Sequence, residues 1–269
     1  MKSRFNGKAI YNPSGKAGEY SRWACNFFTG CSNNCDYCYC KKGFLGSIWH
    51  DKPNLKKCFK DAEDAFNIFC KEIKRNIDDL RQYGLFFSFT TDPMLSETKP
   101  LTIRCLRECM NNGIPVQILT KRADFINDSI WWEIIPEQRK NIAVGFTLTG
   151  CDELEPGASN TEERMNTMRG FHKWGYPTFA SIEPVVNPKT SLDCIRKTAD
   201  CCKLFKVGLM SSKKDYDKKE LLDMIDVMEE IHKQFGCLFY LKDSLLNFLK
   251  MERTGLNPCF VNTDYNVYT

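Results

Sequence analysis

The chain has 269 residues, of which 42% are hydrophobic and 27% charged, and this composition argues against a disordered protein. Lys and Arg together number 38 against 34 Asp and Glu. The resulting net charge of +4 does not indicate a strongly basic nucleic-acid binder, although it permits a local basic patch. The unusual feature is 15 cysteines beside only 3 histidines, too few for a mainly histidine-based metal site.

Cysteines at this density form disulfides, bind a metal or cluster, or remain as buried free thiols. The first residues, MKSRFNGKAIYNPSG, contain no apolar run that could direct secretion. The best apolar stretch, 85–89, is far shorter than the ~20 residues of a membrane span. We therefore expect a cytoplasmic protein with reduced thiols and no membrane segment.

Short apolar runs alternate with longer amphipathic stretches along most of the chain. The apolar runs predict strands at 23–29, 85–90, 116–120, 142–148, 178–182, 204–209 and 238–241. The amphipathic stretches predict helices at 62–83, 97–112, 125–140, 161–174, 191–202, 218–235 and 243–251. Gly84 and Gly113 are expected to end the first two of these helices.

Strands separated by helices imply parallel crossover connections. Six or seven such units predict an α/β fold, a partial (β/α)6-type TIM-like barrel with a C-terminal extension; a flat doubly wound sheet is the alternative. We expect an N-terminal arm at 1–22, a barrel core at 23–210, and a β/α extension at 211–269 packed on the core. The aperiodic tail after Leu256 is expected to pack across one end of the barrel.

Polar residues follow most of the predicted strands, at the places where parallel α/β folds carry their chemistry. In a parallel barrel all of these strand exits face one mouth. The exits are Thr90-Thr91-Asp92, Thr120-Lys121-Arg122, Thr147-Leu148-Thr149, Ser181-Ile182-Glu183 and Gly208-Leu209-Met210.

The segment 30–40 contains the pattern C-x3-C-x2-C, formed by Cys31, Cys35 and Cys38. Three thiolates within eight residues can bind one inorganic centre, and Gly30 and Asn33-Asn34 permit the tight backbone that this requires. A structural zinc site needs a fourth ligand, which Cys40 or a distant cysteine could supply. A four-iron cluster held by three cysteines instead leaves one iron free to bind a ligand.

This motif, with Tyr37 before its last cysteine, resembles the cluster motif of the radical S-adenosylmethionine (radical SAM) superfamily, and the resemblance covers about 24–210. Within the superfamily the chain is most similar to the spore photoproduct lyase-like branch and to related phage and mobile-element proteins. The residues that carry this similarity are Tyr11-Asn12-Pro13, Gly30-Cys31, Cys38-Tyr39, Thr91-Asp92-Pro93, Leu119-Thr120-Lys121 and Ser181-Ile182-Glu183-Pro184.

The resemblance implies an enzyme with a 4Fe–4S cluster on the three cysteines, whose free iron binds the amino and carboxylate groups of S-adenosylmethionine (SAM). Reductive cleavage of SAM would give a 5′-deoxyadenosyl radical that abstracts hydrogen from a substrate. The implied contacts are Thr91 and Asp92 to the cofactor amino group, Lys121 to its carboxylate, Thr147, Thr149 and Glu183 to its ribose, and Tyr37 with the strand end 207–210 to its adenine.

The resemblance favours a nucleic-acid or nucleotide substrate and implies a reductant such as flavodoxin or ferredoxin. A candidate contact surface, with a solvated arm as its alternative, combines Lys2, Arg4, Lys8, Lys16 and Arg22 with Tyr11, Tyr20 and Trp23. Two other functions remain open: a peptide- or protein-modifying radical SAM enzyme, and a non-catalytic zinc-binding interaction module.

The other twelve cysteines are explained most simply as buried reduced thiols. Cys105 and Cys109 lie one helical turn apart and could share a face. Cys201-Cys202 near Cys194 are candidates for an auxiliary cluster, although no second C-x2-C accompanies them. Cys151, just beyond a strand exit, is a candidate hydrogen donor to a substrate radical, as in the photoproduct lyases.

Overall fold

The structure, a computed structural model, describes residues 4–211, 213 and 215–268, so Lys2 of the proposed basic surface lies outside it. Its centre is an eight-stranded sheet in the order β1-β2-β5-β6-β7-β8-β9-β10. Strand β1 (Ile10–Tyr11) is antiparallel to β2 (Ala24–Cys25), and every other neighbouring pair in the sheet is parallel. Strands β1 and β10 form the two edges, so the barrel is partial and open, as the alternation of strands and helices predicts.

The parallel strands after β2 are mostly buried because helices cover their outer face and other segments cover their inner face. Their bounds are β5 (Leu85–Phe87), β6 (Val116–Thr120), β7 (Ile142–Thr147), β8 (Thr178–Val185), β9 (Leu204–Leu209) and β10 (Leu238–Leu241). A separate two-stranded ribbon pairs β3 (Phe28–Thr29) with β4 (Asn54–Leu55).

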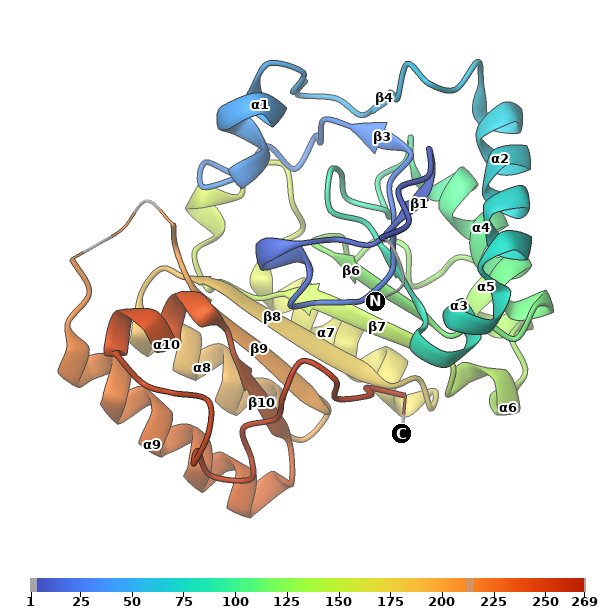
Figure 1. Cartoon of the computed structure of the whole chain (residues 1–269). Helices are drawn as coiled ribbons and strands as arrows, with labels where there is room; N and C mark the ends of the chain where they lie inside the picture. The colour runs from blue at the N-terminus through green and yellow to red at the C-terminus, as the bar shows by residue number, and fades with distance from the viewer. Residues whose placement is uncertain (1–3, 212, 214, 269) are drawn as a thin grey trace.

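Helices follow the strands and lie on the convex side of the sheet (Figure 1). The longer ones are α2 (Ala62–Arg75), α3 (Ile77–Tyr83), α4 (Lys99–Asn111), α7 (Thr161–Lys173), α8 (Pro188–Thr198), α9 (Lys218–Phe235) and α10 (Asp243–Leu249). The short helices are α1 (Gly43–Gly46), α5 (Ile130–Glu133), α6 (Pro136–Arg139), η1 (Gly15–Ala17), η2 (Tyr39–Lys41) and η3 (Asp152–Leu154). None of the helices described is both long and apolar enough to cross a bilayer.

Three predicted elements are divided in the structure. The helix expected at 62–83 is divided at Asn76, whose side-chain amide donates to the Glu72 carbonyl at 2.8 Å and competes with helix continuation. The stretch 125–140 contains only α5 and α6, because Ile135, which precedes a proline, is extended. The run 23–29 is divided between β2 and β3, which belong to different sheets.

The two faces of the sheet carry different cores. The larger core joins the sheet to the helices, and a smaller one fills the concave side. In β5, Phe86 belongs to the concave core, whereas Leu85 and Phe87 belong to the helical core, as strand alternation requires. Gly145 leaves room on the concave side for the Phe179 ring, which would lie 2.3 Å from a Cβ at that position.

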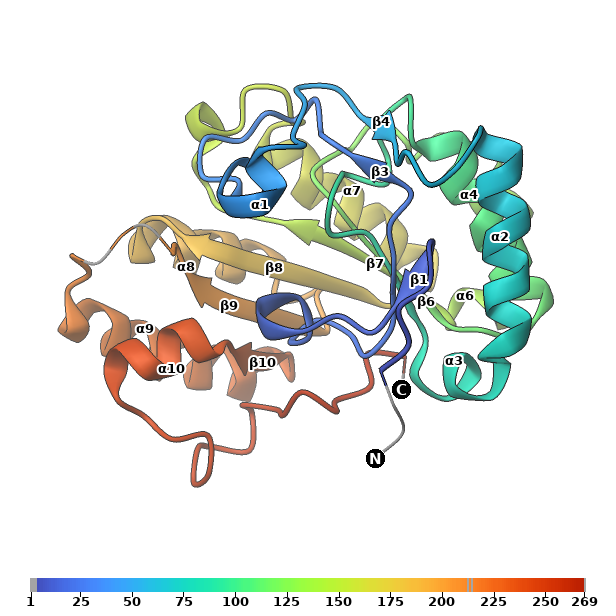
Figure 2. The same cartoon turned by 45° about the horizontal axis from the view of Figure 1, so that its top comes forward.

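The N-terminal arm and the C-terminal tail lie against the concave side (Figures 1 and 2). The Glu72 carboxylate of α2 anchors the arm by accepting hydrogen bonds from the backbone amides of Lys8, Ala9 and Ile10. In the tail, Phe260 bridges to β10 and Val267 belongs to the concave core. The division into arm, core and extension stays a prediction, although β10 continues the sheet directly from β9.

Candidate functional site

A cavity of about 280 Å³ lies at the carboxyl ends of the parallel strands. Residues from five strand exits meet there, as expected for a parallel α/β fold. These residues are Thr90, Thr91 and Asp92 after β5, Thr120 and Lys121 at β6, Thr147 at β7, Ser181 and Glu183 in β8, and Leu209 and Met210 at β9. Val207, Gly208, Arg122 and Thr149 are absent from the lining.

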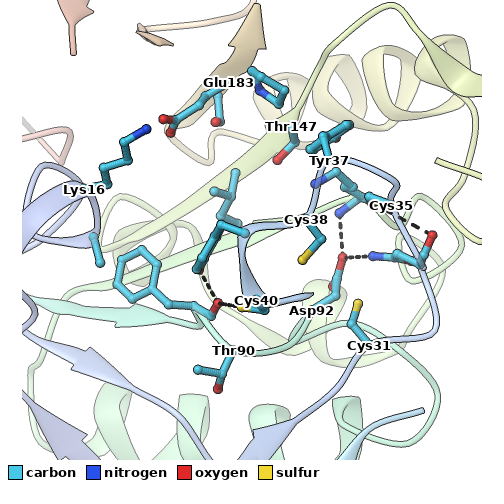
Figure 3. Close-up of a pocket in the computed structure, with 18 of the residues that line it drawn as sticks. Lys16, Cys31, Cys35, Tyr37, Cys38, Cys40, Thr90, Asp92, Thr147 and Glu183 are labelled. Atoms are coloured by element: carbon cyan, nitrogen blue, oxygen red, sulfur yellow. Dashed lines mark hydrogen bonds between the residues drawn. The ribbon is translucent and has the colours of Figure 1, made fainter. Parts of the chain in front are cut away.

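The three cysteines of the motif line the same cavity (Figure 3). Two features of their loop agree with the sequence expectation. Gly30 has a φ of 91°, and a Cβ there would lie 2.4 Å from the Lys52 carbonyl oxygen. Asn34 is left-handed with a φ of 48°. The Cys38 amide donates to the Cys35 carbonyl at 3.2 Å and closes the turn that carries both thiols.

Cys40 also lines the cavity, and its thiol donates to the Phe89 carbonyl oxygen at 3.5 Å. Among the residues that the structure describes, no three Cys, His, Asp or Glu side chains are grouped so as to hold one metal ion. A four-iron cluster binds each cysteine through a different iron, so its ligands need to surround a shared space instead of one point. The three motif cysteines line one cavity, and thiolates are the ligand type that iron–sulfur clusters require.

Three buried polar atoms of cavity-lining residues have no hydrogen-bond partner within the described part of the chain: Asn33 Oδ1, Trp49 Nε1 and Thr91 Oγ1. A buried polar atom without a partner costs about 1–3 kcal/mol, so such atoms usually meet a water or a ligand. Two of them can act as acceptors and two as donors. Their chemistry fits a polar ligand that carries an amino group and hydroxyls.

Asp92 joins the cysteine loop to two strand exits. Its Oδ2 accepts from Asn33 Nδ2 and from the Lys121 amide, both at 2.7 Å. Its Oδ1 accepts from Thr120 Oγ1 at 2.6 Å and from the Met94 amide at 2.9 Å. Each carboxylate oxygen of Asp92 therefore accepts two hydrogen bonds from within the chain. The neighbouring Thr91 Oγ1 is one of the acceptors that have no partner in the described residues.

Lys121 presents a cation to the cavity beside Tyr37. Its Nζ lies 5.3 Å from the centre of the Tyr37 ring and 4.0 Å from Glu155 Oε1. Burial opposes the charged form of Lys121, but the neighbouring Cys35 and Glu155 raise its pKa above the ordinary value. The Tyr37 hydroxyl donates to Glu155, which also pairs with the fully buried Arg164.

Glu183 lies at the opposite end of the cavity from the cysteines (Figure 3). It accepts from the Tyr20 hydroxyl at 2.8 Å and from Lys242 Nζ at 2.5 Å. Lys242, which follows β10, also lies 3.4 Å from Glu19 of the arm. Sequence reasoning placed Tyr20 in a candidate contact surface instead of at this site, and it missed Lys242, because no motif marks either residue here and their partners are distant in the chain.

Comparisons with known proteins relate this architecture to solved structures. No protein-family model and no curated protein matches the sequence. A spore photoproduct lyase variant matches with a TM-score of 0.63 and 15% identity over 86% of this chain and 79% of that chain. A second variant, with bound SAM and dinucleoside spore photoproduct, matches with a TM-score of 0.60 and 16% identity, over 85% of this chain and 78% of that chain. SuiB from Streptococcus suis, bound to SAM, matches with a TM-score of 0.52 and 14% identity, over 82% of this chain and 51% of SuiB. The chain therefore spans about half the length of SuiB.

The chain has the fold of the radical SAM enzymes. This is the fold that the C-x3-C-x2-C motif and its position before the β/α units led us to expect. The cysteine loop (30–40) follows β3, and the candidate cofactor contacts lie at the strand exits. The fold thus brings the predicted site residues to one mouth, apart from Thr149, Val207 and Gly208.

Thr149 does not reach the cavity. It is fully buried, and its hydroxyl accepts from the Cys151 amide at 3.3 Å within a local turn. Cys151 is also absent from the lining, and its thiol lies 4.0 Å from Thr190 Oγ1. The chain turns away from the mouth after Thr147, which explains both differences from the expectation.

The remaining predicted sites are mostly core residues. Cys105, Cys109, Cys194, Cys201 and Cys202 all belong to the helical core. All fifteen cysteines are free thiols. In the proposed basic surface, Tyr20 and Trp23 are buried, so they cannot form an exposed stacking platform.

Proposed function

We propose that this chain is a radical SAM enzyme in which Cys31, Cys35 and Cys38 hold a 4Fe–4S cluster with one open iron. The observation that carries the proposal is that the three cysteines and five strand exits line one cavity in a fold shared with two SAM-bound solved structures. When bound, the cluster and SAM supply an electron and a 5′-deoxyadenosyl radical, which removes hydrogen from a substrate.

The residues of the chain bind and orient SAM. Lys121 supplies the cation for its carboxylate, and the free Thr91 and Asn33 oxygens accept from its amino group. Asp92 contributes by fixing Asn33 and Lys121. Thr147 and Glu183 would contact the ribose, and Tyr37 and the strand end Leu209-Met210 would contact the adenine; we assign no contact to Thr149.

For the substrate we propose a nucleic acid or nucleotide. Support comes from the matching structure that contains a dinucleoside spore photoproduct. The reaction also needs an electron donor, for which a flavodoxin or ferredoxin is suitable. Reduced thiols in all fifteen positions suit a cytoplasmic setting.

The test is anaerobic reconstitution with iron and sulfide, followed by reduction and addition of SAM. We expect 5′-deoxyadenosine from the native protein. Cys31→Ala, Cys35→Ala and Cys38→Ala should each lose the cluster and the product, because a thiolate ligand is removed. The exposed Cys58 provides a matched control, since Cys58→Ala should keep both.

The Cys40→Ala variant separates this proposal from the zinc-binding alternative. We expect it to retain the cluster, because three ligands are sufficient to hold a cluster with an open iron. A colourless protein that binds zinc, needs Cys40 for this binding and yields no 5′-deoxyadenosine would contradict the proposal.

A further inference from the structure

The loop between β7 and α7, residues 151–160, packs directly against the cysteine loop. The Asp36 amide donates to the Leu154 carbonyl at 3.0 Å, and the Gly157 amide donates to the Asn33 carbonyl at 3.1 Å. A Cβ at Gly157 would lie 2.0 Å from the Ser32 carbonyl oxygen, so only glycine allows this approach. The 151–160 loop therefore supports the backbone on which Cys35 and Cys38 are carried.

Glu155 lies at the centre of this contact, and its side chain is completely buried. Its carboxylate accepts from the Tyr37 hydroxyl and from Arg164 Nη2, and it lies 4.0 Å from Lys121 Nζ. A buried carboxylate is stable only when cations and donors surround it. One carboxylate thus links the residue before Cys38 to the cation at the exit of β6.

Glu155 is held from outside the cavity, which it does not line. Its partner Arg164 is also fully buried and donates to the Thr147 carbonyl at 2.7 Å and to Asp152 at 3.1 Å. The Ser159 amide in the same loop donates to the Lys121 carbonyl at 3.0 Å. These contacts fix Glu155 relative to β7 and β6. The Tyr37 hydroxyl, which donates to this fixed carboxylate, is therefore held in place as well.

We propose that Glu155 is a positioning residue that fixes Tyr37, and through it the Cys35–Cys38 turn, beside Lys121. The consequence for SAM binding rests on the proposed function, whereas the effect on the cysteine loop does not require it. Without the carboxylate, Tyr37 loses its acceptor, Lys121 loses a neighbouring negative charge, and the buried Arg164 keeps only Asp152 as an acidic partner.

The first test measures hydrogen exchange of the metal-free protein, so it does not depend on the cluster. Glu155→Gln and Tyr37→Phe should each speed exchange of the Asp36 and Cys38 amides about tenfold or more, because a charged hydrogen bond is lost. Glu153→Gln is the matched control: Glu153 is exposed in the same loop, and its variant should exchange like the native protein.

Two further features of this experiment separate positioning from a general structural role. The double variant should exchange no faster than the faster single variant, because both changes break the same link. In all of these variants the amides of β9 should exchange as slowly as in the native protein. Unchanged exchange at residues 36–38, or equally faster exchange throughout the chain, would overturn the proposal. If Glu155→Gln does not fold, the exchange rates of Tyr37→Phe alone decide whether the link holds the cysteine turn.

The second test measures the equilibrium dissociation constant of SAM with the reconstituted, oxidised protein. At equal iron content, Glu155→Gln should raise this constant about tenfold, and Glu153→Gln should leave it unchanged. If the native protein takes up no cluster, the proposed function fails and hydrogen exchange still decides the role of Glu155. If native and Glu155→Gln proteins bind SAM equally well, the positioning proposal fails while the proposed function stands.

Discussion

At the scale of single residues, the site depends on carboxylates that connect segments far apart in the chain. Asp92 is the clearest case, because its two oxygens accept four hydrogen bonds from residues 33, 94, 120 and 121. The sequence marks Asp92 as a polar strand exit and suggests a cofactor contact. Its partners belong to three separate segments, so its bridging role is visible only in the fold.

Asp92→Asn should therefore destabilise the protein and loosen the cavity. The new amide group would place a donor against donors that now meet an oxygen, and we expect a loss of about 2–4 kcal/mol in the free energy of unfolding. Urea unfolding of the metal-free protein measures this loss. Asp124→Asn is the control, because Asp124 pairs with Arg122 at an exposed position; equal stability of the two variants would contradict the bridging role.

At the scale of elements, strong local signals agree with the structure. The predicted strands at 116–120, 204–209 and 238–241 and the helix at 218–235 have the observed bounds. Asp217 caps that helix and the left-handed Gly236 ends it, which are signals contained in the sequence itself. The helix expected at 62–83 is wrong as one element because a side chain to backbone contact at Asn76 outweighs the continuous apolar pattern.

The N-terminal arm is an element whose position depends on one side chain of α2. Glu72→Gln replaces an acceptor oxygen that faces backbone amides of the arm, so we expect the arm to detach more often. Trypsin cleavage within residues 4–22 should become about tenfold faster, since the loss of charged hydrogen bonds favours the open form. Glu63→Gln on the same helix should not change the cleavage rate; equal rates for both variants would exclude Glu72 as the anchor.

At the scale of the whole molecule, buried thiols give the stability a dependence on pH. Burial raises the pKa of Cys194, Cys237 and Cys259 to about 11 and that of Cys201 to about 12. Unfolded thiols lose their protons near pH 8.5. Between these values the folded state binds more protons than the unfolded state, so the stability that these thiols contribute is present below about pH 8.5 and is lost as the pH rises.

We therefore expect the free energy of unfolding of the reduced, metal-free protein to fall between about pH 9 and pH 11. Each thiol contributes at most about 1.4 kcal/mol per pH unit. Urea unfolding across this range, with alanine at Cys194, Cys201, Cys237 and Cys259, should give a less steep decline from a lower starting stability. Cys58→Ala is the control and should keep the native slope; identical slopes in all three proteins would disprove the assignment.

The sequence by itself determined the parallel α/β architecture, the three-cysteine motif and the strand exits that carry polar residues. These features arise from periodicity and spacing within a few residues, so they are readable without a structure. The tertiary structure alone decided that Thr149 and Cys151 face away from the mouth, that Asp92 and Glu155 act as links, and that Tyr20 and Lys242 meet Glu183. The contacts of Glu183 with Tyr20 and Lys242, of Asp92 with Asn33 and of Glu155 with Tyr37 join residues more than fifty positions apart. They depend on the curvature and register of the sheet instead of on local sequence.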